Sequence, residues 1–141
     1  MSDVTIFHNP ACTTSRNTLA LLRHAGLQPE VVEYLKTPPS TQEVRRLLAE
    51  MKIPVRELLR EKGTPYAELG LADAKWSDED LLDFIRQHPI LMNRPIVRTP
   101  LGTRLCRPSE EVLAILPVGP IAPFAKEDGE MIRDTGARVA P

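Results

Sequence analysis

The fold is decided by residues 5–16, which read TIFHNPACTTSR. A short apolar and β-branched run, typical of a buried strand, ends at His8. A turn with Asn9 and Pro10 follows, and a single cysteine, Cys12, then stands where a helical pattern begins. The first N–H groups of a helix have no partner within it, and the helix dipole adds about half a positive charge there. A thiol at this place is favoured as thiolate, and an anion can bind beside it.

The residues after the cysteine predict a β-α-β unit. Thr13 or Thr14 can cap a helix whose apolar face includes Leu19 and Leu22, and the apolar residues 31–35 predict a second strand. Two strands joined through one helix are expected to lie parallel, with a right-handed crossover.

The second half of the chain predicts a β-hairpin and a final helix. A strand is expected to begin at Pro95 and to return, after a turn, through residues 103–106, and Ser109 is expected to cap the helix that follows. Between the two halves, residues of about 40–89 carry helical patterns separated by prolines.

Together these patterns predict an α/β protein of the thioredoxin-like arrangement. It has a four-stranded mixed sheet with helices, and a helical insertion between the β-α-β half and the C-terminal β-hairpin-α half. We expect residues 1–116 to form a single domain with the insertion at about 40–89. Residues 117–141 contain several prolines and glycines and no periodic pattern, so we expect a loosely ordered tail there.

Composition limits the function. The 141 residues suffice for one domain with a real core, and a net charge of −1 argues against a broad nucleic-acid surface. No apolar run approaches the ~20 residues of a membrane span, and no signal-peptide pattern opens the sequence. The two cysteines, Cys12 and Cys106, fit a reducing cytosol better than a disulfide scaffold. We therefore expect a cytoplasmic protein that has neither nucleic acid nor a membrane as a partner.

Cys12 is the strongest functional candidate. A free cysteine is often a small buried hydrophobe, but Cys12 stands in a polar loop, which favours a nucleophile. Redox loops of this fold carry Cys-x-x-Cys, whereas the fourth position here is Ser15. No disulfide can form within the loop, so an external thiol is needed to resolve any adduct. Ser15 can donate a hydrogen bond to the thiolate or simply cap the helix, and the sequence leaves both roles open.

A histidine and three arginines can act with the thiol. An imidazolium at His8 would lower the pKa of the thiol further if the loop is compact. Arginine's planar fork suits tetrahedral oxyanions, and the candidates lie in the insertion (Arg60) or before a proline (Arg94 and Arg107). Alternation along a strand sends Cys106 away from Arg107, so Cys106 is expected to be buried and structural. No spacing typical of metal ligands is present.

Three stretches resemble the glutaredoxin-coupled arsenate reductases. They are HNPACTTSRNT at 8–18, QHPILMNRPIV at 87–97 and TPLGTRLCRP at 99–108. The resemblance runs from about residue 3 to about residue 129 and includes KEDG at 126–129, so it covers nearly the whole chain.

The resemblance implies an enzyme that converts arsenate to arsenite, with no bound cofactor and no metal. Cys12 matches the family's nucleophile, and His8 matches the residue that helps to lower its pKa. Ser15 matches a serine near the thiolate, and Pro95 matches a cis-proline. The implied cysteine–arsenate intermediate is resolved by glutathione, a co-substrate, and by glutaredoxin, a partner protein, in a pathway of arsenic detoxification.

The resemblance also implies a substrate site. Arg60, Arg94 and Arg107 match three arginines that bind the oxyanion and the arsenical intermediate. The loop amides, here those of Thr13 and Thr14, complete the anion site. Thr13 is a departure, because it stands where the family often has glycine, and its Cβ restricts the loop.

Two other functions stay open. A non-enzymatic redox regulator of the same superfamily, which binds RNA polymerase, typically carries Cys-x-x-Cys and need not keep the arginines. Ser15 and the three arginines, Arg60, Arg94 and Arg107, therefore argue against it. A glutathione-dependent thiol oxidoreductase of unknown substrate would use the arginines for the carboxylates of glutathione or for another anion. The sequence does not exclude that function.

Overall fold

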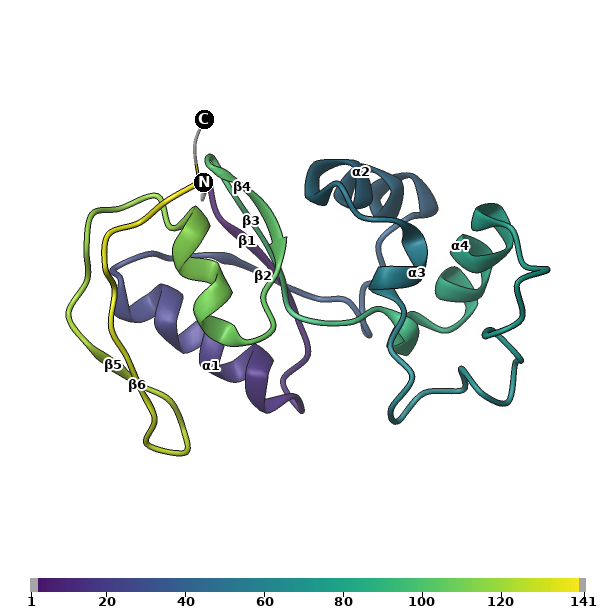
Figure 1. The fold of residues 1–141 in the computed structure, drawn as a ribbon, viewed down its shortest axis with the longest axis horizontal. Coiled ribbons are helices and arrows are strands. Elements are labelled where there is room, and N and C mark those ends of the chain that lie inside the picture. The colour runs from purple at the N-terminus through teal and green to yellow at the C-terminus, as the bar shows by residue number, and fades with distance from the viewer. Residues whose placement is uncertain (1–2, 140–141) are drawn as a thin grey trace. The chain divides into compact units, whose positions relative to one another are not determined.

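A four-stranded mixed sheet is the framework around Cys12 (Figure 1). The computed structural model describes residues 3–139 and divides into two units, one of residues up to Glu33 and from Arg94 onward, the other of Tyr34–Asn93. In the first unit the strands lie in the order β2-β1-β3-β4, with β1 parallel to β2 and β3 antiparallel to both of its neighbours. The predicted fold class is therefore confirmed. The strands are β1 (Thr5–His8), β2 (Glu30–Glu33), β3 (Ile96–Thr99) and β4 (Gly102–Leu105).

Two helices cover one face of this sheet. Helix α1 (Thr13–His24) and the 3-10 helix η2 (Ser109–Ile115) pack side by side, as Figure 1 shows. Ile6 of β1 pairs with Val97 of β3, and both belong to the buried cluster under the two helices. The other members of that cluster are Val4, Leu19, Leu21, Leu22, Cys106, Val112, Ile115, Leu116 and Ile132.

The last predicted helix differs in type from the expectation. Ser109 was expected to cap an α-helix, but its buried hydroxyl donates instead to the carbonyl of Thr14 in α1, at 3.0 Å. Pro108 occupies the N-cap position, and the segment forms 3-10 turns. A hydroxyl committed to a neighbouring helix is not available to its own first turn, which explains the difference.

The second unit consists of short helices around its own apolar core. Ser40 caps α2 (Thr41–Met51), because its Oγ accepts from the Glu43 N–H at 3.0 Å, and Ser77 and Asp80 form a reciprocal capping box on α4 (Asp78–Gln87). Pro54 is the N-cap of the short helix α3 (Val55–Leu58). The elements are α2 (Thr41–Met51), α3 (Val55–Leu58), α4 (Asp78–Gln87) and the 3-10 helix η1 (Pro89–Leu91).

The two ends of the second unit are joined. The Tyr34 hydroxyl donates to the carbonyl of Met92 at 3.1 Å, and both side chains are fully buried. The Asn93 N–H donates to the Leu58 carbonyl, and the Arg60 N–H donates to that of Leu91, each at 2.8 Å. Because of these contacts the unit extends beyond the helical patterns that we predicted at about 40–89.

The segment after Pro117 has more order than the tail that we predicted. Strands β5 (Phe124–Ala125) and β6 (Met131–Ile132) form a small antiparallel sheet, and Ile132 is buried in the cluster under α1. His24 of α1 contacts the ring of Phe124. The residues that hold this segment against α1, such as Phe124 and Ile132, are isolated in the sequence between prolines and glycines. No hydrophobic periodicity therefore predicts the order of the segment.

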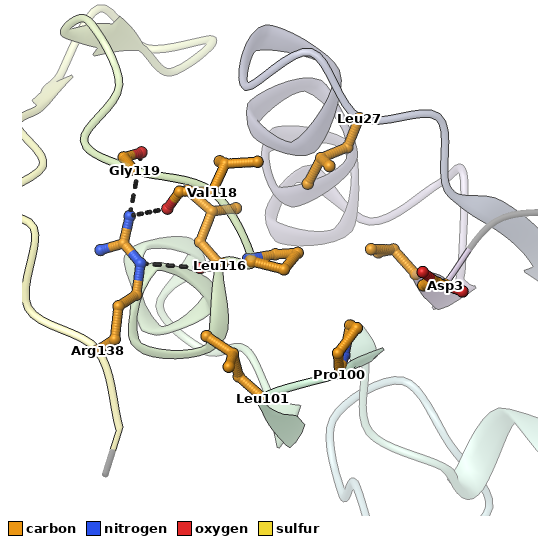
Figure 2. Close-up of a pocket in the computed structure, with 10 residues that line it drawn as sticks. Asp3, Leu27, Pro100, Leu101, Leu116, Val118, Gly119 and Arg138 are labelled. Carbon is orange, nitrogen blue, oxygen red and sulfur yellow. Dashed lines mark hydrogen bonds between the residues drawn. The ribbon is translucent and has the colours of Figure 1, made fainter. Parts of the chain in front are cut away.

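An ion pair closes this C-terminal segment. Arg138 donates to both carboxylate oxygens of Asp134, at 3.0 and 2.9 Å, and the Asp134 side chain is only 1% exposed. Arg138 also donates to the backbone carbonyls of Leu116, Val118 and Gly119 (Figure 2). The hydrogen bonds from Arg138, against the opposing effect of burial, lower the pKa of Asp134 to about 2.

We predict that Asp134→Asn lowers the free energy of unfolding by about 2 kcal/mol at pH 7, because it removes a charge-assisted, bidentate contact from a buried position. Since the folded pKa lies below that of the unfolded chain, this contribution is present above about pH 4. It is lost as the pH falls toward 2, so the native protein and the variant should converge there. Urea titrations at several pH values measure this. Asp83→Asn, which removes an exposed partner of Arg86, is the control with an unchanged midpoint, and equal midpoints for all three proteins at pH 7 would contradict the prediction.

Candidate active site

The loop after β1 places the thiol at the start of α1. The side chain of Asn9 accepts from the Ala11 N–H at 2.9 Å, which closes an Asx turn, and its backbone carbonyl accepts from the Cys12 N–H at 3.0 Å. Cys12 is extended, with φ −98° and ψ 121°, and is itself the N-cap of the helix. The prediction that Thr13 or Thr14 caps the helix is wrong, because the turn brings the chain into the helix one residue earlier.

The charged form of Cys12 is favoured. Burial on its own raises the pKa of this thiol, but the Ser15 N–H and the guanidinium groups of Arg107 and Arg94 donate to the sulfur and outweigh it. The pKa of Cys12 consequently lies below its ordinary value. Cys12 is half-buried and free, so its sulfur is both ionised more readily than an ordinary thiol and open to a reactant.

The sheet brings two of the predicted arginines together. Ile96 of β3 pairs with Leu105 of β4, and the same antiparallel register, continued past the strand ends, sets Arg94 opposite Arg107. Nη1 of Arg107 lies 2.9 Å from the Arg94 carbonyl and 3.6 Å from the Cys12 sulfur. The Arg94–Pro95 peptide bond is cis, as the resemblance implied, and so is the bond that follows Arg107.

His8 and Ser15 form a buried pair under the loop. His8 Nδ1 lies 2.6 Å from the Ser15 Oγ, which also accepts from the Asn9 N–H at 3.1 Å. The thiolate thus receives its hydrogen bond from the backbone N–H of Ser15, whereas the hydroxyl serves the loop. Neither role that the sequence left open for this hydroxyl, donation to the thiolate or helix capping, is the observed one.

The expected imidazolium at His8 is not supported. Burial lowers the pKa of His8; Glu33 opposes this effect, and the charges of Arg23 and Arg16 add to it. Since burial lowers the pKa of His8 from its ordinary value, the neutral form of the ring is favoured over an imidazolium beside the thiol. His8 acts on the site through its hydrogen bond to Ser15, which holds the first turn of α1 against the end of β1.

Cys106 is buried and structural, as its position in the hairpin predicted. Its side chain is 0% exposed, and burial raises its pKa far above the ordinary range. It belongs to the core cluster beneath α1 and η2, whereas the neighbouring Arg107 is directed to Cys12. The second thiol is therefore not presented to a reactant in the folded protein.

The remaining predicted site residues lie as follows. Thr13 is exposed and Thr14 is half-buried, and both belong to the first turn of α1, whose N–H groups have no acceptor within the helix. Arg60 belongs to the other unit, where its guanidinium donates to the Lys62 carbonyl at 3.1 Å and to Asn93 Oδ1 at 3.3 Å. Its part in an anion site stays a prediction.

The predicted turn at Asn9 and Pro10 is confirmed, but the two hydrogen bonds by which Asn9 shapes the loop were not predicted. The pattern Asn-Pro-Ala before the cysteine is their signal, since asparagine before proline favours an Asx turn.

A hollow in the first unit offers no second reactive site. It lies near the hairpin turn at Pro100 and Leu101 and is lined mainly by apolar side chains (Figure 2). Its cationic residue, Arg138, donates to backbone carbonyls and to Asp134, and its lining residues include neither cysteine nor histidine. Within residues 3–139, no group of histidine, cysteine, aspartate and glutamate side chains can hold a metal ion, and no helix is long and apolar enough to cross a membrane.

Comparisons with known proteins find relatives that match most of this chain. The ArsC family model matches residues 7–115 of the chain. An arsenate reductase of Rhizobium meliloti is 62% identical over 135 residues, which cover 96% of this chain and 96% of that protein. An arsenate reductase of Escherichia coli strain K12 is 57% identical over 138 residues, 98% of each chain. The solved structure of an arsenate reductase from Vibrio cholerae has a TM-score of 0.77 and 45% identity, and covers 80% of this chain and 97% of that chain.

We predict that Arg107→Ala raises the pKa of Cys12 and slows its alkylation by iodoacetamide severalfold at pH 7, because the thiolate loses a guanidinium donor and a nearby positive charge. Rates measured against pH should converge once the thiol is fully ionised. Arg104→Ala, which removes an exposed partner of Glu111, is the control and should alkylate like the native protein. Mass spectrometry should find Cys106 unmodified in each folded protein. An identical pH profile for Arg107→Ala would remove this arginine from the site.

Proposed function

The chain belongs to the ArsC family, and on that premise we propose that it is an arsenate reductase in which Cys12 is the nucleophile. One observation carries the proposal: the sulfur of Cys12 has a lowered pKa and accepts a hydrogen bond from Arg107 at the start of a helix. A thiolate in such surroundings can attack an electrophilic centre that arrives as an oxyanion. Arsenate is such a substrate.

Binding uses the donors around the sulfur. Arg94 and Arg107 offset the negative charge of arsenate, and the N–H groups of Thr13 and Thr14 in the first turn of α1 donate to its oxygens. The resemblance adds Arg60 from the second unit. The donors of the first unit hold the anion with its arsenic atom beside the Cys12 sulfur, and they also stabilise charge that shifts onto oxygen during attack.

The chemistry begins with the Cys12 thiolate. Its sulfur attacks arsenic(V), an arsenate oxygen takes up protons and leaves as water, and a sulfur–arsenic bond forms. The sulfur of glutathione then attacks the same arsenic atom, and a second water leaves. A glutaredoxin thiolate next attacks the glutathione sulfur, and the electron pair of the breaking sulfur–arsenic bond passes to arsenic.

The last step restores the free thiol. Arsenic is reduced from As(V) to As(III) by two electrons, while glutathione and glutaredoxin are oxidised to a mixed disulfide. Water cleaves the bond between Cys12 and arsenic(III), and arsenite is released. In a cell this cycle would remove arsenate from the cytoplasm, where glutathione keeps thiols reduced, as part of arsenic detoxification.

The requirement for an external thiol follows from the loop. Ser15 stands where a second cysteine would resolve the adduct, and the other cysteine, Cys106, is fully buried. Glutathione and glutaredoxin supply the two missing sulfur atoms in this proposal, and the protein itself needs no bound cofactor.

Arsenate-dependent oxidation of NADPH, coupled through glutathione, glutaredoxin and glutathione reductase, tests the proposal. We expect turnover that Cys12→Ser abolishes, because oxygen replaces the only cysteine sulfur in residues 3–139 that is not fully buried. Cys106→Ala, a core substitution away from the reacting sulfur, should keep most of the activity. Turnover that needs no glutathione, or that survives in Cys12→Ser, would refute the assignment.

Arginine variants test the substrate site. Arg94→Ala and Arg60→Ala should each lower kcat/KM for arsenate at least tenfold, since each loss of a charge-assisted contact is worth roughly 1.5–3 kcal/mol. Lysine at these positions should restore part of the loss, because the charge returns without the planar fork. Arg86→Ala, an exposed residue of the same unit as Arg60, serves as the control. If Arg60→Ala behaves like Arg86→Ala, the second unit supplies no arginine to the substrate.

A further inference from the structure

Arg16 spans the loop that carries the thiol. It lies in the first turns of α1, and its guanidinium turns back along the chain. Nη1 donates to the Pro10 carbonyl at 2.9 Å, and Nη2 donates to the Thr13 Oγ1 at 3.1 Å. Since Pro10 and Thr13 stand on either side of Cys12, one planar group is bonded to the chain both before and after the reacting sulfur.

Glu127 fixes the orientation of that guanidinium. Its Oε2 accepts from Nε of Arg16 at 2.8 Å, and its Oε1 accepts from Nη2 at 3.1 Å, so the carboxylate and the guanidinium meet through two bonds. A fork of this kind defines the plane of the guanidinium, whereas a single contact lets it rotate.

The turn that carries Glu127 is anchored to α1 independently of this pair. The Glu127 N–H donates to Oδ1 of the buried Asn17 at 2.9 Å. The next residue back, Lys126, pairs with Glu110 at 2.9 Å. These contacts hold the β5–β6 turn beside the first turns of α1, so the carboxylate is presented in one place.

The positive charge of Arg16 also interacts electrostatically with the sulfur of Cys12. The hydrogen bond from Arg16 to Glu127 raises the pKa of Arg16 most, and the negative charge of Cys12 raises it further. By reciprocity, the guanidinium favours the thiolate without contacting it.

We infer that Glu127 is a positioning residue of the catalytic loop: it aligns Arg16, and Arg16 holds Pro10 and Thr13 so that Cys12 keeps its place at the helix start. As a statement about arsenate reduction the inference rests on the proposed function, but the loop geometry does not. Glu127, Arg16 and the hydroxyl of Thr13 thus form a relay, a chain of hydrogen bonds that ends at the residue after Cys12. Where glycine stands at this position, no side chain can accept from Arg16, so the threonine gives this chain a contact of its own in the loop.

Two physical accounts of Glu127 make opposite predictions. If it acted only as a nearby negative charge, its removal would leave the positive charge of Arg16 uncompensated beside the sulfur, and the thiol pKa would fall. If it positions the loop, its removal frees Arg16 to rotate, the Ser15 N–H and the arginines meet the sulfur less often, and the thiol pKa rises. The bidentate geometry and the buried anchor at Asn17 favour the second account.

The first experiment measures iodoacetamide alkylation of Cys12 against pH in the full-length protein. Glu127→Gln should slow alkylation at pH 7 about threefold to fivefold and move the midpoint to higher pH, while Glu127→Asp should keep at least half of the native rate. The matched control is Glu111→Gln, which breaks an ion pair of the same length and similar exposure at Arg104 and should leave the profile unchanged. Faster alkylation in Glu127→Gln, or the same profile as in Glu111→Gln, would overturn the inference.

The second experiment tests the relay through Thr13. Thr13→Val removes the hydroxyl and keeps the shape, and Thr13→Ser keeps the hydroxyl, so the valine variant should slow alkylation more than the serine variant does. Because Glu127 and Thr13 act through the same guanidinium, the double variant Thr13→Val with Glu127→Gln should be no slower than the slower single variant. Multiplied effects in the double variant would contradict a shared route through Arg16.

Arsenate kinetics complete the test. Glu127→Gln should lower kcat for arsenate about fivefold with little change in KM, since the arginines that bind the anion remain in place. An unchanged kcat, or a loss confined to KM, would contradict the positioning role. Alkylation needs no arsenate: if the native protein fails to turn over arsenate, the proposed function fails, while the alkylation profiles still decide whether Glu127 positions the loop.

Discussion

Two opposing effects on the pKa of Cys12 determine the reactivity of this protein: burial of the sulfur raises the pKa, and the hydrogen-bond donors around the sulfur lower it. Burial alone would return the proton to Cys12. Three donors lower the pKa of the thiol against this effect. The Ser15 N–H lies in the first turn of α1, and Arg94 and Arg107 lie at the ends of the β3–β4 hairpin. Because the helix and the hairpin come from opposite ends of the first unit's sequence, the lowered pKa of the thiol requires both to be folded on the same sheet. The stability of the fold and the reactivity of the thiol are thus coupled.

Beneath the charged atoms lies a neutral layer that gives the loop its shape. The ring of His8, the hydroxyl of Ser15 and the backbone N–H of Asn9 are buried together and hydrogen-bonded. A charged imidazole there would need solvation that the site does not provide, which is why its pKa falls. The histidine thereby serves the thiolate through geometry, and the positive charge of the site comes from arginines, which remain charged in such surroundings.

Much of the fold and part of the site could be predicted from local patterns. The run that ends at His8, the β-α-β order and the hairpin that begins at Pro95 specify the sheet, because strand periodicity and short connections leave few topologies. The lone reactive cysteine and the buried one were distinguished by their neighbours and by alternation along a strand. The order of the C-terminal segment was missed, since Ile132, Asp134 and Arg138 are isolated anchors whose partners lie elsewhere in the chain.

The fold class, the thiol at a helix start and the lack of a second cysteine in its loop follow from residues that are neighbours in the chain, so local sequence was enough to predict them. Only the tertiary structure shows which hydrogen-bond partner each group around Cys12 has. It set Arg107 against the sulfur, assigned the Ser15 hydroxyl to His8 and not to the thiolate, and brought Glu127 to Arg16 across 111 positions. Hydrogen bonds reach only about 3 Å and depend on direction, so which donor meets which acceptor is settled only when distant segments pack together.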